Sequence, residues 1–160
     1  MVTTEVVERP VAERPTKDSP DAIAEWLVGA AREIPEGLQA FDEFAWRMLA
    51  TGLPLLRVTL HSGTLHPQFL GTTFIWWRTR GQSEQTLIAH EITDVIHYKD
   101  NPVQRVCSGG ETLRRRLDGA EATLDFAVLT ELKAHGATDY LALPIRSIHG
   151  RKSRWTRLPI

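Results

Sequence analysis

Apolar residues recur every three or four positions in two segments near the start of the chain, which is the spacing of amphipathic helices. In the first segment they are Ile23, Trp26, Leu27, Ala30 and Ile34. Ser19 precedes it as an N-cap, and Pro20 suits the first helical position. The second segment covers 38–51, and Gly52 follows it as a C-cap. The pattern therefore predicts two short helices, over residues 20–34 and 38–51.

Further along, apolar and polar residues alternate, which is typical of strands with one buried face. This alternation predicts strands over 55–61, 72–78 and 86–92. A helical pattern returns over 125–135, and a short apolar strand follows over 140–145. The order is two helices, two or three strands joined by hairpins, a helix and a strand. It indicates an α+β fold in which helices flank an antiparallel sheet.

Composition divides the chain into three parts. Residues 1–19 combine prolines and alternating charges with scattered valines, so they bury little apolar surface and are predicted to be a disordered N-terminal arm. Residues 20–148 form the predicted folded domain. Residues 149–160 carry several basic side chains and no acid, which predicts a basic C-terminal tail or linker.

Charge and cysteine usage exclude several classes of protein. The chain has 160 residues, with 19 basic and 20 acidic side chains and a formal charge of −1. This balance argues against a dedicated nucleic-acid binder, which normally has a basic excess. No apolar run has membrane-spanning length, and the start does not resemble a secretory signal. The single cysteine, Cys107, fits a reducing compartment. A cytoplasmic protein without a membrane partner is therefore expected.

Six segments of the sequence, taken in order, carry a resemblance to a known family. They are Gly52-Leu53-Pro54-Leu55-Leu56-Arg57, Thr64-Leu65-His66-Pro67-Gln68, Phe74-Ile75-Trp76-Trp77, Leu113-Arg114-Arg115-Arg116-Leu117, Phe126-Ala127-Val128-Leu129-Thr130-Glu131-Leu132 and Gly136-Ala137-Thr138-Asp139-Tyr140-Leu141-Ala142-Leu143-Pro144. The series covers residues 21–148 and resembles the N-terminal region that precedes the catalytic domain in a group of bacterial class III adenylate cyclases. The general plan also resembles a GAF-type sensor domain.

The resemblance implies a GAF/PAS-like fold in which two N-terminal helices lead into the sheet. It implies a non-catalytic regulatory or sensor domain for cAMP signalling, which forms a homodimer and controls a cyclase catalytic domain or another effector. The two metal-binding carboxylates of the cyclase catalytic domain have no counterpart in this chain. The chain itself is therefore not expected to be an enzyme, and its cofactor, if it has one, is unknown.

The densest aromatic segment indicates a binding site for a small molecule. Trp76 and Trp77 are neighbours on a predicted strand, so their side chains face opposite sides of the sheet. One tryptophan packs on the core, and the other needs a cover. A pocket built from Trp76 or Trp77 with Arg57, His61 and His90 would have apolar walls and the few polar groups that a small ligand needs.

Two other groups could cover the tryptophan that does not face the core. A side chain of the predicted helices, Trp26 or Phe44, is favoured, and the surface of a second subunit is the alternative. The helix over 22–34 is the expected dimerisation element, because its short apolar stripe needs a partner surface. The stripe consists of Ile23, Trp26, Leu27 and Ala30. A ligand-free protein-interaction domain is therefore an alternative function.

A small enzyme that uses Cys107 with nearby histidines is the other alternative. His90-Glu91, or Asp94 with His97, would pair an imidazole with a carboxylate, as general-base catalysis requires. Backbone amides of the loop 108–110 would stabilise an anion, although the same residues fit an ordinary turn. The six histidines do not stand at metal-site spacings, so no metal site is predicted.

Two basic clusters complete the candidates. The arginines at 114–116 suit phosphate, because guanidinium forks match its oxygens. On the helix expected there they would fan over different faces, so a solvated surface is favoured. The basic residues of the C-terminal tail fit contact with nucleic acid or a membrane surface, and they fit a plain linker equally well.

Overall fold

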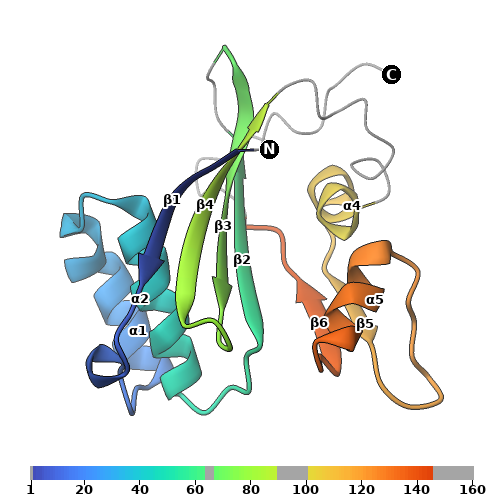
Figure 1. Cartoon of the computed structure of the whole chain (residues 1–160), viewed down its shortest axis with the longest axis horizontal. Coiled ribbons are helices and arrows are strands. Elements are labelled where there is room, and N and C mark those ends of the chain that lie inside the picture. The colour runs from blue at the N-terminus through green and yellow to red at the C-terminus, as the bar shows by residue number, and fades with distance from the viewer. Residues whose placement is uncertain (1, 64–66, 90–100, 146–160) are drawn as a thin grey trace. The chain divides into compact units, whose positions relative to one another are not determined.

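The computed structural model describes residues 2–63, 67–89 and 101–145 (Figure 1). The chain divides into unit 1, Met1–Ala89, and unit 2, His90–Ile160. Both units combine helices with antiparallel strands, so the predicted α+β class is confirmed. The sequence predicts one domain over 20–148, and the boundary between the units falls inside it. Periodicity finds the elements, but it does not say which elements contact one another.

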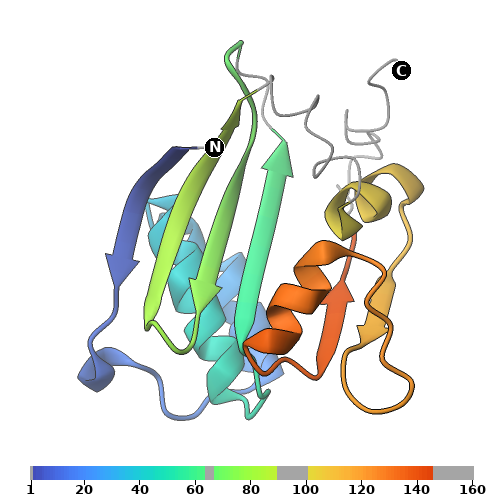
Figure 2. The same ribbon diagram turned by 45° about the vertical axis from the view of Figure 1, so that its right-hand side comes forward.

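Unit 1 contains a four-stranded antiparallel sheet in the order β1-β4-β3-β2 (Figure 2). Its strands are β1 (Val2–Glu8), β2 (Arg57–Gly63), β3 (Phe69–Trp77) and β4 (Gln82–Ala89). β2, β3 and β4 follow one another as hairpins, whereas β1 joins β4 from the start of the chain. Gly81 closes the β3–β4 turn with a φ of 67°, a left-handed conformation that suits glycine.

The helices of unit 1 lie on one face of this sheet (Figures 1 and 2). They are the 3₁₀ helix η1 (Val11–Glu13), α1 (Pro20–Val28), the 3₁₀ helix η2 (Ala30–Glu33) and α2 (Gly37–Ala50). Ser19 caps α1, because its hydroxyl accepts a hydrogen bond from the amide of Ala22. The single helix predicted over 20–34 is interrupted at Gly29, whose φ of −109° and ψ of −105° are not helical.

The core of unit 1 forms where α2 packs on β3. Phe41, Ala45 and Trp46 of α2 and Trp76 of β3 are all buried. The rings of Trp46 and Trp76 meet edge to face, with centroids 5.0 Å apart, which is a favoured aromatic geometry. A helix therefore covers Trp76, the tryptophan of the core, through Phe41 and Trp46. The interpretation that Trp26 or Phe44 covers the other tryptophan is wrong, because Trp77 follows Trp76 on β3 and so lies on the face of the sheet away from α1 and α2.

The N-terminal residues differ from the predicted disordered arm, because the structure contains β1 and η1 there. β1 pairs with β4 in a register that places Val6 opposite Glu84. Arg9 then forms ion pairs with Asp42 and Glu43 of α2. Strand pairing and ion pairs hold this segment in place. The prediction of disorder rested on its low content of apolar residues, which reveals neither interaction.

In its described residues, 101–145, unit 2 contains two helices and a two-stranded antiparallel sheet, β5-β6. Its elements are α4 (Pro102–Gly109), β5 (Leu113–Arg116), α5 (Ala127–Ala134) and β6 (Asp139–Ala142). α5 lies within the predicted range 125–135, whereas β6 begins one residue before the predicted range 140–145 and ends three residues before its end. α4 replaces the expected turn around Cys107, and β5 replaces the expected helix under the arginine run. The C-terminal tail over 149–160 lies outside the described residues.

No helix in the described part of the chain is both long and apolar enough to cross a membrane.

Candidate functional site

Three of the predicted ligand residues share one face of the unit 1 sheet. In the β2–β3 register, Arg57 is opposite Trp77 and His61 is opposite Thr73. Directly opposed residues of antiparallel strands point to the same side of a sheet, and so do residues two positions apart on one strand. Arg57, His61 and Trp77 therefore belong to the face opposite α1 and α2. We call this the Arg57–His61–Trp77 face.

Trp77 is held between two cations. Its side chain is 5% exposed, and the guanidinium carbons of Arg57 and Arg80 lie 4.9 Å and 5.3 Å from the ring centroid. Both distances suit cation–π attraction. Arg57 comes from the neighbouring strand and Arg80 from the β3–β4 turn, so strand pairing and the turn together fix this arrangement. The sequence analysis did not single out Arg80.

His61 is hydrogen bonded within the same face. Its Nδ1 lies 2.9 Å from the hydroxyl oxygen of Thr73. Although part of the residue is exposed, desolvation by the surrounding protein and the positive charge of Arg57 lower the pKa of His61 to about 4. The imidazole is therefore neutral at neutral pH, where it has one donor and one acceptor nitrogen.

Trp76 belongs to the opposite face of the sheet and is part of the core. It is fully buried against Trp46, and no hydrogen-bond acceptor reaches the Nε1 of either indole in the described part of the chain. Because Trp76 is in the core, it does not line the same surface as Trp77. His90 lies outside the described residues, so the proposed set contains three residues on one face, one on the other and one not described.

Two threonines on the Arg57–His61–Trp77 face were missed by the sequence analysis. Thr73 and Thr86 are buried and opposed in the β3–β4 register. Their alternation with the apolar residues of β3 and β4 is the signal that would have found them, because buried strand positions repeat with a period of two. Thr73 orients His61 through the hydrogen bond between them, and the two threonines add buried hydroxyl groups to this face.

The predicted dimerisation stripe is divided by the structure. Ile23 is buried within unit 1, and the guanidinium carbon of Arg47 lies 4.9 Å from the centre of the Trp26 ring. Leu27 is 44% exposed, whereas Ala30 belongs to η2 and not to α1. Leu27 and its neighbour Val28, which is 73% exposed, are the apolar part of α1 that remains accessible.

The alternative that the chain is a small enzyme needs an activated nucleophile, and the described residues do not provide one. Cys107 is half-buried in α4, and burial raises the pKa of its thiol, whereas a nucleophilic cysteine needs a lowered pKa. His90, Glu91, Asp94 and His97 lie outside the described residues. Among the described residues, no group of three or more His, Cys, Asp and Glu side chains is placed to hold a metal ion.

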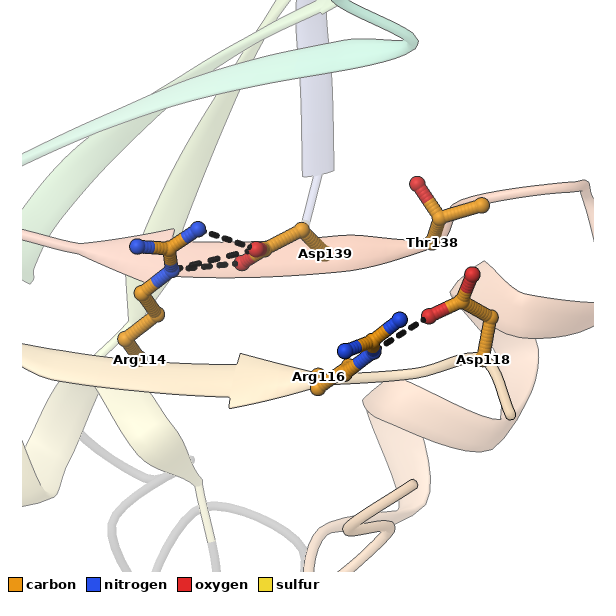
Figure 3. Close-up of a pocket in the computed structure, with 5 residues that line it drawn as sticks. All are labelled: Arg114, Arg116, Asp118, Thr138 and Asp139. Atoms are coloured by element: carbon orange, nitrogen blue, oxygen red, sulfur yellow. Dashed lines mark hydrogen bonds and ion pairs between the residues drawn. The ribbon is translucent and has the colours of Figure 1, made fainter. Parts of the chain in front are cut away.

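Each arginine of the run over 114–116 has a carboxylate partner. Arg114 donates to Asp139 with a shortest distance of 2.6 Å, and Arg115 donates to Asp125 with a shortest distance of 2.8 Å. Arg116 donates to Asp118 at 2.9 Å (Figure 3). These hydrogen bonds raise the pKa of Arg114 and Arg115 and lower the pKa of Asp139 and Asp125.

A recess of about 500 Å³ lies beside these pairs (Figure 3). It is lined by Arg114, Arg116, Asp118, Thr138 and Asp139. Its two arginines and two aspartates have no net charge, so an anion gains little long-range attraction there. A phosphate would have to compete with carboxylates that already occupy the guanidinium forks. The arginine run is thus a set of ion pairs on β5.

No protein-family model, no curated protein and no solved structure matches the chain. Its function is therefore argued from the geometry of its own residues.

Proposed function

We propose that the chain is a GAF-like, non-catalytic regulatory domain of the adenylate cyclase type, which dimerises and controls a cyclase effector in response to a small ligand. The resemblance of residues 21–148 supports the family. The observed α+β architecture, with helices ahead of an antiparallel hairpin series, is compatible with it. A cytoplasmic location accompanies this proposal.

The observation that carries the ligand part of the proposal is the β2–β3 register, which brings Arg57, His61 and Trp77 to one face. Arg57 supplies a fixed positive charge, and neutral His61 supplies a hydrogen-bonding nitrogen. Trp77 is 5% exposed, so it holds the guanidinium of Arg57 in place and offers little surface of its own. Together Arg57 and His61 suit a small anionic molecule. Small ligand sites commonly have a few directed polar groups of this kind.

Two observations favour binding over catalysis. The pKa of the only cysteine, Cys107, is raised, which is opposite to the change that nucleophilic catalysis requires. The arginines at 114–116 are each paired with a carboxylate, so their charges are already neutralised within the chain. We therefore place function in binding and in contacts between chains.

Native mass spectrometry tests the ligand. The purified chain is incubated with a protein-free small-molecule extract and compared with a denatured sample. We expect an added non-covalent mass on the native wild type and at least about tenfold weaker retention in Arg57→Ala, because about 1.4 kcal/mol of lost charge-assisted contact is a factor of ten. Arg32→Ala, a substitution in η2, is the matched control. Equal retention by both variants would contradict the site.

A fusion tests the regulatory role. The chain is joined in front of a class III cyclase catalytic domain, and cAMP formation is measured with and without the extract. We expect the extract to change cAMP formation in the wild-type fusion and to change it less in the Arg57→Ala fusion. If cAMP formation is unaffected by the extract and by the substitution, the regulatory proposal is wrong.

A ligand-free interaction domain is the second candidate, and one observation favours it. Leu141, Leu143 and Ile145 occupy alternate positions at the end of unit 2 and are 54%, 62% and 81% exposed. Only Leu141 belongs to β6, but the three exposed apolar side chains lie within five residues of one another. Contiguous exposed apolar surface often marks a protein contact. This candidate predicts bare polypeptide in the mass spectrum.

A further inference from the structure

Residues 5–14 contribute no buried side chain to unit 1. We define the N-terminal strap as residues 2–14, which include β1 and η1. From Glu5 to Arg14, every side chain is exposed or intermediate, and Val6 and Val11 are 49% and 75% exposed. Apolar burial, which holds the rest of the sheet, therefore contributes little to the attachment of the strap.

Backbone pairing and ion pairs hold the strap instead. β1 pairs with β4 along its length, with an irregularity between Thr3 and Glu5. Arg9 donates from Nε to Asp42 at 2.7 Å and pairs through Nη1 with Glu43 at 2.8 Å. Arg14 donates to the carbonyl oxygen of Arg9, and its guanidinium carbon lies 4.4 Å from the ring centre of Trp46.

The groups that bind Arg9 belong to α2 and β4. The Asp42 side chain is fully buried in α2, and Ser83 of β4 donates a hydrogen bond of 2.7 Å to its other oxygen. A buried carboxylate without a cation is unfavourable, so this position favours a cation, which Arg9 supplies. Unit 1 thus has a specific site for Arg9 beside the edge of β4.

A short hinge separates the strap from the helices. No hydrogen bond or ion pair to the described chain involves Thr16 or Lys17. At Asp18 the chain is fixed again, because its amide donates to the carbonyl oxygen of Ala50 at 3.2 Å and its carboxylate pairs with Arg47 at 3.0 Å. The strap can therefore leave β4 while α1 and α2 keep their contacts.

We propose that the N-terminal strap is exchangeable, and that in a dimer each strap occupies the β4 edge of the other copy. The occupant is identified by the structure itself, since the edge, Asp42 and Ser83 already hold this sequence. An exchanged dimer makes the same strap contacts as a closed monomer, so protein concentration decides which form is populated. This proposal does not rest on the proposed ligand or effector.

Disulfide trapping distinguishes the two forms. Val6 and Glu84 are Cα partners in the β1–β4 register, and opposed strand positions have Cα separations within the disulfide range. Val6→Cys with Glu84→Cys is introduced into Cys107→Ser, and tagged and untagged chains are mixed under reducing conditions before oxidation. We expect disulfides between tagged and untagged chains, whose share rises with protein concentration.

The matched control is the pair Thr59→Cys with Ile75→Cys, which are Cα partners in the β2–β3 hairpin. This hairpin packs on the core and is not part of the strap, so its disulfides should form within one chain at every concentration. The proposal is overturned if the Val6–Glu84 pair also forms only disulfides within one chain up to the highest concentration tested.

The ion pairs of Arg9 set the rate of exchange. Arg9→Gln removes charged hydrogen bonds that hold the closed strap, and mixing of tagged and untagged chains should become about tenfold faster. Arg114→Gln, which removes an exposed ion pair of unit 2, should leave the rate unchanged. If Arg9→Gln does not fold, Glu43→Gln is used instead, because it removes one ion pair of Arg9 while buried Asp42 keeps its cation, and it should also speed mixing. An unchanged rate in that variant contradicts the role of Arg9.

Discussion

The two neighbouring tryptophans of β3 differ because strand geometry sends them to opposite faces. Trp76 meets Trp46 and Phe41 in the core, whereas Trp77 lies under the guanidinium groups of Arg57 and Arg80. Their alternation follows from the sequence alone, since successive side chains of a strand point to opposite sides. Their partners do not follow from it, because Trp46 is 30 positions before Trp76 in the chain.

His61 makes unfolding depend on pH. Its pKa is about 4 in the folded chain and about 6.5 when unperturbed, so between these values the unfolded chain holds a proton that the folded chain lacks. The free energy of unfolding should therefore fall as the pH is lowered from about 6.5 towards 4, and His61 should contribute no slope above that window. Urea unfolding at a series of pH values measures this slope.

Two variants isolate the contribution of His61. His61→Gln should flatten the dependence on pH between about 6.5 and 4, because the titrating group is gone. Thr59→Gln, an exposed position on the same strand, should keep the wild-type slope. A histidine titration by NMR that places the pKa of His61 near its unperturbed value would contradict the desolvation argument.

At the scale of elements, the helices were easier to predict than the strands. α2 lies within one residue of the predicted range at each end, because its apolar period and Gly52 are local signals. β1 and β5 were missed. β1 exists through pairing with β4, about 80 residues later in the chain, and β5 through pairing with β6. Strand pairing depends on residues far apart in the sequence, whereas a hydrophobic periodicity describes only neighbouring positions within one element.

The end of α4 gives a test with a matched pair of glycines. Gly110 has a φ of 68°, and its amide donates to the carbonyl oxygen of Val106, so it ends the helix in a left-handed conformation. A side chain in that conformation costs about 1–2 kcal/mol. Gly110→Ala should therefore lower the free energy of unfolding of unit 2 by about that amount, as measured by urea denaturation.

Gly109 is the control for this substitution. It is the last residue of α4, its φ is not in the left-handed region, and a Cβ there would meet no atom within 4 Å. Gly109→Ala should be neutral or stabilise by up to about 1 kcal/mol, because alanine favours helices. Equal effects of the two substitutions would show that the C-cap conformation is not what Gly110 contributes.

At the scale of the whole molecule, both the proposed α1 contact and the exchanged strap predict a dimer. The mass of one chain is 18.0 kDa, and light scattering after size exclusion should give twice that value at high protein concentration. If α1 carries the contact, Leu27→Glu should return the mass to that of one chain, because Leu27 is exposed and apolar and a buried unpaired charge is costly.

Leu53→Glu controls for a new surface charge, since Leu53 is also exposed on unit 1 but lies outside both α1 and the N-terminal strap. It should leave the dimer intact. A single-chain mass for the wild type at every concentration would contradict both the α1 contact and the exchanged strap. If the Leu27→Glu variant is still a dimer, the proposed α1 contact is wrong and the exchanged strap is the remaining contact to test.

The sequence by itself determined the α+β class, the two helices before the hairpins, the opposite faces of Trp76 and Trp77, and the balance of charge. These properties depend on residue type and on spacing within one element. Only the tertiary structure decided that residues 2–8 form a strand, that Asp42 is buried beside Arg9, and that the arginines at 114–116 each meet a carboxylate. Strand pairing and charge neutralisation join residues that are distant along the chain, so folding has to bring them together before their partners are defined.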